Sequence, residues 1–265
     1  MVESGGPVAR PLAESVVVVA GGTSGIGLEA AAQLAEAGAT RLALVGRDPG
    51  RGEAALAAVR ERAPGADVRY LRADLTDPAA ARGMAEAAGA AFGRVDVLVN
   101  SIAGGDLPRL FQDTPLEEIA GIVDRNLCTV LHATRAVWDG MRAQRGGVVI
   151  NVASDAAKIA TPGETVMGAA LSGIAMFTRA LALEGKRSGI RANCVTPSIV
   201  RGTPLYDRLM AAPFTGRLFA KAEAQAHLGV VTPADIAPLI VFLASPAAAK
   251  LSGQAISVNG GISAA

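Results

Sequence analysis

Aromatic residues, cysteines and an excess of charge of either sign are all scarce in this sequence of 265 residues. Aromatics make up 3% of the chain, so the core is expected to consist of small aliphatic side chains that pack closely. The net charge of +1 gives no electrostatic reason to expect nucleic acid or an anionic membrane as a partner. The two cysteines, Cys128 and Cys194, provide neither a disulfide framework nor the spacing of a metal site. A cytoplasmic location is therefore expected.

Long hydrophobic runs are also missing, because no stretch reaches the ~18 apolar residues of a membrane-spanning helix. The first 14 residues contain two glycines and two prolines, but no apolar segment like that of a signal peptide. We expect them to be a mobile leader. The remaining residues, 15–265, have a length suited to one α/β domain.

Short apolar runs alternate with longer amphipathic stretches along the chain. This alternation predicts a doubly wound parallel sheet with helices on both faces, which is a Rossmann fold in a single α/β domain. The expected strands are 16–20, 42–45, 68–72, 95–100, 148–152, 191–195 and 255–258. The expected helices include 28–37, 51–63, 78–92, 116–144 and 167–187, with Thr114 as an N-cap.

The segment 204–229 is long, mixed in composition and poorly periodic. Ligands of a doubly wound sheet bind beyond the carboxyl ends of its strands. Because this segment follows the sixth expected strand, it would overhang the ligand site. We expect a substrate lid here, with a surface insert as the alternative.

A glycine-rich turn, Ala20-Gly-Gly-Thr-Ser-Gly-Ile-Gly27, lies between the first expected strand and a helical stretch. Gly21 would permit the tight turn, Gly25 would let the backbone approach a pyrophosphate, and Gly27 would allow the helix to pack closely on the strand. Free N–H groups and the helix dipole favour negative charge at such a turn. The motif in this context predicts a dinucleotide site.

The glycine spacing G-x-x-x-G-x-G resembles that of the short-chain dehydrogenase/reductase family, and the resemblance runs almost end to end. Further matching segments are 73–75, 95–100, 124–128, 150–154, 193–197 and 252–261. The resemblance implies a nicotinamide cofactor and a homodimer or homotetramer formed through 116–144, 167–187 and the C-terminal segment. The cofactor contacts that it implies are Gly21, Thr23, Ser24, Gly25, Ile26, Gly27, Asp74, Leu75, Ser101, Ile102, Ala103, Val200 and Thr203.

Arg47 lies 20 residues beyond Gly27, where an acidic residue normally holds the adenosine ribose of NAD. A guanidinium at this place can form a bidentate pair with a 2′-phosphate, so NADP(H) is expected over NAD(H). Asp48, one residue later, could still approach the ribose. An exposed arginine at a strand end is the alternative interpretation of Arg47.

The catalytic positions that the resemblance implies are altered. Family members usually carry a tyrosine 13 residues after a serine and a lysine four residues further on, but counting from Ser154 reaches Met167 and Leu171. Neither of these side chains can transfer a proton. Ser154 is expected to donate a hydrogen bond to a substrate oxygen, and Asn126 matches the asparagine of the family's catalytic tetrad. Structural roles are the alternatives for both.

Two segments, Ser101-Ile-Ala103 and Val166-Met-Gly168, resemble those of bacterial enoyl-acyl-carrier-protein reductases. These enzymes carry a tyrosine three residues before the methionine, where this chain has Glu164, and a lysine where it has Leu171. Enoyl-thioester reductases that lack the family's tyrosine are similar as well. The resemblance implies an NADPH-dependent reductase of a conjugated C=C bond, with an acyl thioester of coenzyme A or an acyl carrier protein as substrate. Met167 would line its apolar pocket.

Two other functions remain open, namely a carbonyl reductase or tailoring enzyme with a relocated acid and a dinucleotide-binding protein without catalysis. Glu164 is either a solvated loop residue or an unusual acid near the substrate. Tyr206, in the expected lid, is either a replacement proton donor or an apolar contact. Lys158 is expected to be solvated, and His132 and His227 are expected to lie in the core or on the surface.

Overall fold

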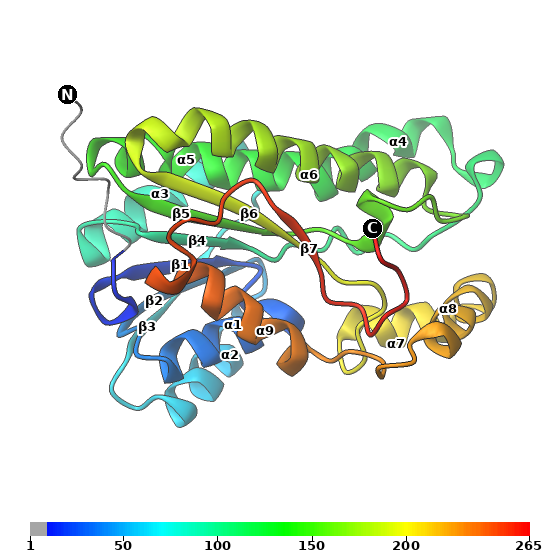
Figure 1. The fold of residues 1–265 in the computed structure, drawn as a ribbon, viewed down its shortest axis with the longest axis horizontal. Helices are drawn as coiled ribbons and strands as arrows, with labels where there is room; N and C mark the ends of the chain where they lie inside the picture. The colour runs from blue at the N-terminus through cyan, green and yellow to red at the C-terminus, as the bar shows by residue number, and fades with distance from the viewer. Residues whose placement is uncertain (1–9) are drawn as a thin grey trace.

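A seven-stranded parallel sheet with the order β3-β2-β1-β4-β5-β6-β7 forms the centre of the computed structural model, which describes residues 10–265 (Figure 1). The order of the strands reverses between β1 and β4, where a doubly wound sheet binds its ligands. The predicted fold class is confirmed, and every predicted strand falls within two residues of the observed bounds. These are β1 (Val16–Ala20), β2 (Arg41–Gly46), β3 (Asp67–Arg72), β4 (Val97–Asn100), β5 (Gly147–Val152), β6 (Ile190–Thr196) and β7 (Ala255–Ser257).

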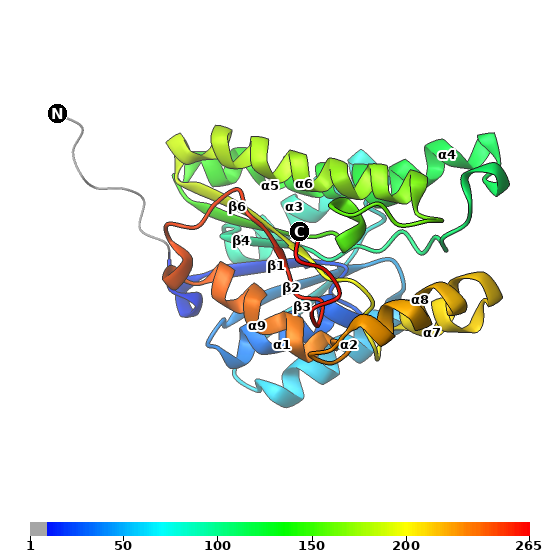
Figure 2. The ribbon, with the colours of Figure 1, turned by 45° about the vertical axis from the view of Figure 1, so that its right-hand side comes forward.

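Helices cover both faces of the sheet (Figures 1 and 2). One layer contains α1 (Gly25–Glu36), α2 (Pro49–Arg62) and α9 (Pro233–Ala244), and the other contains α3 (Pro78–Phe92), α5 (Thr129–Ala143) and α6 (Thr165–Gly185). Successive strand residues point to opposite faces, so Val17 and Val19 pack in one cluster while Val18 packs in the other. Both clusters consist mainly of Ala, Val, Leu and Ile, as the scarcity of aromatics predicts.

The stretch 116–144 is not the single helix that was predicted. It contains α4 (Leu116–Val123), a wider π-helical turn at Asp124–Cys128 and then α5. Single π turns inside α-helices occur frequently at functional sites. The predicted N-cap is also wrong, because Thr114 donates its hydroxyl to the carbonyl of Leu110 and Pro115 is the N-cap of α4.

The segment 204–229 contains two helices that its poor periodicity did not predict, α7 (Pro204–Ala211) and α8 (Pro213–Gln225). Thr203 begins α7, because its hydroxyl oxygen accepts a hydrogen bond from the backbone N–H of Tyr206 at 3.1 Å. The two helices pack on each other around a small cluster that is separate from the sheet core and is formed by Ile199, Leu209 and Phe219.

The predicted end of the leader, at residue 14, is wrong. Leu12–Glu14 form a 3-10 turn, and Leu12 is buried in the core cluster beneath α1 and α2. The rest of the predicted leader, residues 1–9, lies outside the described residues.

Within residues 10–265, one segment, Thr165–Ser188, is long and apolar enough to cross a membrane by length and composition. Its mean hydropathy is 1.6, although Arg179 and Glu184 interrupt the apolar run. In the fold this segment is α6 with the 3-10 turn that follows it, and it packs along β6. Part of its apolar surface remains uncovered, including Met176 and Leu183, which are 59% and 65% exposed.

Candidate active site

A cavity of about 740 Å³ opens at the carboxyl ends of β1, β4, β5 and β6, and α7 and α8 form part of its wall. The structure therefore brings together residues that are spread over most of the chain. The predicted site residues on the wall are Gly21, Thr23, Ser24, Gly25, Ile26, Arg47, Asp74, Leu75, Ser101, Ile102, Ala103, Asn126, Ser154, Met167, Val200 and Thr203. Gly27 is the predicted site residue that does not line the cavity.

The glycine turn packs closely against the start of α1 and against the backbone that follows β4. Gly21 has a φ of +79°, and a Cβ there would lie 2.2 Å from the carbonyl oxygen of Ser101. A Cβ on Gly27 would lie 2.3 Å from the carbonyl oxygen of Gly21, so Gly27 supports the turn from behind. Ser24, the N-cap of α1, makes no side-chain cap bond, and it lines the cavity together with Gly25 and Ile26, the first residues of the helix, whose N–H groups have no partner within the helix. This arrangement fits a dinucleotide pyrophosphate.

The supporting role of Gly27 predicts a difference between two glycine variants. Gly27→Ala should lower the free energy of unfolding by about 1–3 kcal/mol, because the backbone of Gly21 must move. Gly83 lies within α3 with no atom within 4 Å of its would-be Cβ, so Gly83→Ala should raise stability by up to about 1 kcal/mol. Urea denaturation of the two variants measures both effects. A Gly27→Ala protein as stable as the wild type would contradict the close packing described above.

Two arginines line the end of the cavity next to β2. Arg47 follows β2, and its Nη1 lies 3.7 Å from Oδ2 of Asp74, with both side chains about half exposed or more. Arg51 is a second wall cation that the sequence analysis missed. Arg51 lies three residues after Asp48, about one helical turn, and this spacing could have indicated that it lies near Arg47 and Asp48. Asp48 itself accepts the backbone N–H of Arg51 at 2.9 Å and caps α2, so its carboxylate already has a structural partner.

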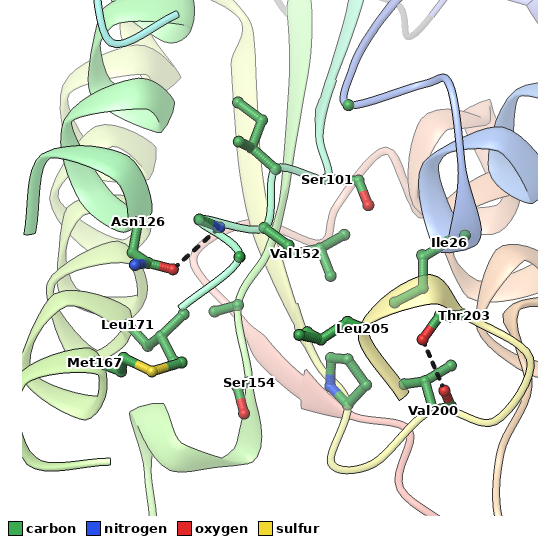
Figure 3. A pocket seen from close by; sticks show the side chains of 18 of the residues that line it. Ile26, Ser101, Asn126, Val152, Ser154, Met167, Leu171, Val200, Thr203 and Leu205 are labelled. Atoms are coloured by element: carbon green, nitrogen blue, oxygen red, sulfur yellow. Dashed lines mark hydrogen bonds between the residues drawn. The ribbon is translucent and has the colours of Figure 1, made fainter. Parts of the chain in front are cut away.

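The altered catalytic positions lie together at the other end of the cavity. Met167 and Leu171 are neighbours on α6, one turn apart, and face the same space as Ser154 and Asn126 (Figure 3). Leu171 also packs against the cluster formed around Val130, Ile174 and Cys194. The wall at the usual tyrosine and lysine positions is therefore apolar.

Ser154 lies directly after β5, where it caps a short 3-10 turn. Its hydroxyl oxygen accepts the backbone N–H of Ala156 at 3.2 Å. A hydroxyl that accepts one bond still has its own hydrogen to donate. Ser154 can therefore donate to an oxygen atom of a ligand in the cavity.

Asn126 lies in the π turn and is buried. Its two amide hydrogens bond Oδ2 of Asp106 and the carbonyl of Ile122, both at 2.9 Å, and its Oδ1 accepts the N–H of Gly104 at 3.3 Å. Since both hydrogens of the amide are used, the geometry favours the structural alternative, in which Asn126 holds the loop that follows β4.

Glu164 is not a solvated loop residue. It lines the cavity at the start of α6 and is only 9% exposed. Burial raises the pKa of its carboxyl to about 7, although a hydrogen bond from the Thr161 hydroxyl acts in the opposite direction. The side chain is therefore a carboxyl that exchanges its proton near neutral pH.

The other candidate proton donors are engaged elsewhere. Tyr206 reaches the cavity wall, but its hydroxyl donates to Oε1 of Glu223 at 3.0 Å, and the same oxygen lies 3.0 Å from Arg201. Lys158 is not solvated as predicted, since its ammonium bonds the hydroxyl of Ser257 and the carbonyl of Ala265. His132 contacts the carbonyl of Leu75 at 3.0 Å, away from the catalytic end.

Known proteins match nearly the whole chain. The family model described as Enoyl-(Acyl carrier protein) reductase matches residues 20–263. The 2,3-dihydroxy-2,3-dihydro-p-cumate dehydrogenase of Pseudomonas putida is 34% identical over 96% of each chain. Acetoacetyl-CoA reductase of an Acinetobacter species is 34% identical over 94% of this chain and 98% of its own. An NADPH-bound short-chain oxidoreductase of Pseudomonas aeruginosa PAO1 with an atypical catalytic center superposes with a TM-score of 0.86 at 31% identity, covering 97% of this chain and 99% of that one.

Proposed function

The chain belongs to the short-chain dehydrogenase/reductase family, and from that premise we propose that it uses NADPH to reduce the C=C bond of an enoyl thioester. The observation that carries this proposal is the apolar pair Met167 and Leu171 beside a serine that can still donate a hydrogen bond. A site of this composition can stabilise negative charge on an oxygen, but it lacks the tyrosine and lysine that usually protonate an alkoxide.

The dinucleotide would lie along the end of the cavity formed by the glycine turn, Asp74 and the two arginines. When bound, its reduced nicotinamide supplies a hydride to the substrate. Gly21 and the first turn of α1 would hold the pyrophosphate, and Arg47 with Arg51 would hold a 2′-phosphate. Because Leu171 stands where family members usually carry a lysine, no ammonium group is available there to bind the cofactor. The affinity for the cofactor would therefore depend on the contacts of the glycine turn, Asp74 and the two arginines.

The chemistry of a conjugated thioester suits the remaining residues. As the β-carbon is reduced, negative charge develops on the thioester oxygen, and a neutral donor such as Ser154 can stabilise it. Met167 and Leu171 provide an apolar surface for the acyl group. The name of the family model supports an enoyl substrate. The name of the Acinetobacter relative supports a thioester of coenzyme A but not the C=C bond, since acetoacetyl-CoA is a ketone.

We also propose that α7 and α8 form the lid over the substrate. Leu205, Leu209 and Phe219 of these helices line the cavity, and a lid that excludes water would strengthen the hydrogen bond from Ser154. A surface insert would not be expected to supply apolar side chains to the wall of the site.

A substrate panel tests the proposed function. The protein is incubated with NADPH and, in separate reactions, with crotonyl-CoA, acetoacetyl-CoA, cyclic ketones and quinones, and the oxidation of NADPH is followed. We expect crotonyl-CoA to be reduced and the ketones to remain unchanged. Reduction of ketones without enoyl thioesters would replace this proposal by a carbonyl reductase with a relocated acid. NADPH binding without any turnover would indicate a non-catalytic dinucleotide-binding protein.

Cofactor choice provides a second test. Because Arg47 and Arg51 can pair with a 2′-phosphate, NADPH should bind at least about tenfold more tightly than NADH, or about 1.4 kcal/mol. Arg47→Ala should remove most of this difference, whereas Arg82→Ala, on the exposed side of α3, should leave it intact. Calorimetric titration measures the affinities. Equal affinity of the wild type for both cofactors would contradict the assignment.

Self-association is proposed from the uncovered apolar side chains of the second helical layer. Leu116 on α4 is 78% exposed, and Met176 and Leu183 on α6 are more than half exposed. Exposed large apolar side chains on neighbouring helices are typical of an interface between copies. Light scattering at micromolar concentration should therefore show a dimer or tetramer, and a monomer would contradict the proposal.

A further inference from the structure

We propose that Glu164 is the proton donor of this site, and that its carboxyl group delivers the proton that completes the reduction of the substrate. The inference rests on the proposed reductase function. It assigns to the N-cap residue of α6 the role for which the apolar pair Met167 and Leu171 is unsuited.

Glu164 lies at the catalytic end of the cavity. Glu164 is the N-cap residue of α6 and lies three residues before Met167. Both residues line the same cavity, about one helical turn apart. Ser154, the candidate donor to the substrate oxygen, lines that end of the cavity as well (Figure 3).

The other acids on the wall of the cavity lie elsewhere or have bonded partners. The wall contains four carboxyl groups, and Asp48 and Asp74 lie at the arginine end. Asp155 follows Ser154, but its carboxylate accepts bonds from Ser263 at 2.6 Å, Asn259 at 2.8 Å and Ser257 at 3.3 Å. Tyr206 is held by Glu223. Among the described wall residues, Glu164 is thus the acid at the catalytic end that is not enclosed in such a network.

The surroundings of Glu164 explain its burial. Gly163, with a φ of +87°, accepts the backbone N–H of Arg109 at 2.8 Å through its carbonyl. A Cβ on Gly163 would lie 2.8 Å from the ring of Phe214 on α8 and 3.4 Å from Pro108. The loop after β4 and α8 therefore cover the start of α6 and keep water away from it.

No cation compensates for this burial. The cations on the elements around Glu164 are Arg109, Arg125, Lys158, Arg208, Arg217 and Lys221, and the acids include Asp106, Asp113, Glu118, Asp155, Asp207 and Glu223. Arg109 pairs with Glu118, Arg125 with Asp106, and Arg208 donates to the carbonyl of Gly105. Within residues 10–265, none of these groups forms an ion pair with Glu164, and burial raises the pKa of its carboxyl to about 7 against the opposite effect of the Thr161 hydroxyl. A neutral carboxyl is thus available at physiological pH.

The reduction of a C=C bond needs two electrons and two hydrogens, and the hydride supplies both electrons and one hydrogen at the β-carbon. The π electrons of the substrate move toward the thioester oxygen, to which Ser154 donates a hydrogen bond. The O–H bond of Glu164 then breaks while a C–H bond forms at the α-carbon, which gives the saturated thioester. The carboxylate regains its proton from water.

Kinetics of two matched variants test this role. Glu164→Gln should lower kcat for crotonyl-CoA by about 10²-fold with little change in KM. Glu184→Gln removes an exposed carboxyl from the same helix and should leave kcat unchanged. Wild-type kcat/KM should fall as the pH rises through about 7, because the proton leaves Glu164. This fall should disappear in Glu164→Gln and persist in Glu164→Asp. A Glu164→Gln enzyme with wild-type kcat and pH profile would overturn the inference.

A measurement without substrate separates this inference from the proposed function. Infrared difference spectra of the protein between about pH 6 and about pH 8 should show the carbonyl band of a protonated carboxyl, and Glu164→Gln should lose that band. Its absence from the wild type would overturn the inference whatever the substrate. If the panel shows reduction of ketones alone, the proposed function fails, and the same variants and pH profiles measured with the ketone decide whether Glu164 is the donor.

Discussion

Replacing Ser154 with alanine is expected to slow the reduction of crotonyl-CoA by about 10²-fold, the effect of removing one donor to a developing oxyanion. The hydroxyl oxygen of Ser154 accepts the backbone N–H of Ala156, and its hydrogen remains for the substrate. Because this bond strengthens as charge develops, kcat should fall while KM changes little. Steady-state oxidation of NADPH measures both parameters.

Ser172 provides the matched control for this variant. It lies on α6, and its hydroxyl donates to the carbonyl of Ala157 at 3.0 Å instead of facing the cavity. Ser172→Ala should therefore keep wild-type kcat. A Ser154→Ala enzyme within about threefold of the wild type would assign Ser154 to the capping of the 3-10 turn alone.

Restoring the family's usual pair by Met167→Tyr and Leu171→Lys should not raise the enoyl activity. Both positions line the apolar end of the cavity, and a phenol at 167 would occupy the space assigned to the acyl group. A higher rate with crotonyl-CoA in the double variant would show that the apolar pair has no part in binding the substrate.

The parts of the fold that were predictable from the sequence are those determined by local patterns. Strands buried on both faces are continuous apolar runs, and the glycine turn after β1 indicates both the fold and the cofactor end of the site. The π turn at Asp124–Cys128 was not predictable, because the side-chain pattern of a helix continues through it. The helices α7 and α8 were missed because they pack on a small cluster of their own, away from the sheet.

The environment of Glu164 shows why the catalytic end was harder to predict. Its sequence neighbours Thr161, Gly163 and Thr165 suggest a solvated loop. Pro108 of the loop after β4 and Phe214 of α8 lie against the adjacent Gly163 and so cover this end of α6. Long-range contacts of this kind leave no periodic signal in the sequence, and the altered pKa of the carboxyl follows from them.

The same burial has a large expected effect on stability. The pKa of the Glu164 carboxyl is about 7 in the folded protein and near the ordinary value of 4.5 in the unfolded chain. The folded state therefore binds this proton more tightly, and the stabilisation is fully present below about pH 4.5 and is lost as the pH rises through about 7. At about pH 8 the folded protein must bury a carboxylate at a cost of about 3 kcal/mol, from about 1.4 kcal/mol per pKa unit.

Glu164→Gln removes this cost because a neutral amide of similar shape replaces the carboxylate. The free energy of unfolding of the variant, measured by urea denaturation relative to the wild type, should rise by about 2.5 kcal/mol between about pH 5 and about pH 8, because about 1 kcal/mol of the total effect is already present at about pH 5. Glu184→Gln, which alters an exposed carboxyl on the same helix, should show no comparable change. If the difference between Glu164→Gln and the wild type were the same at both pH values, the carboxyl would already be ionised at the lower one. Glu164 would then be ionised at neutral pH and could not act as the proton donor, and the proton for the substrate would have to come from water.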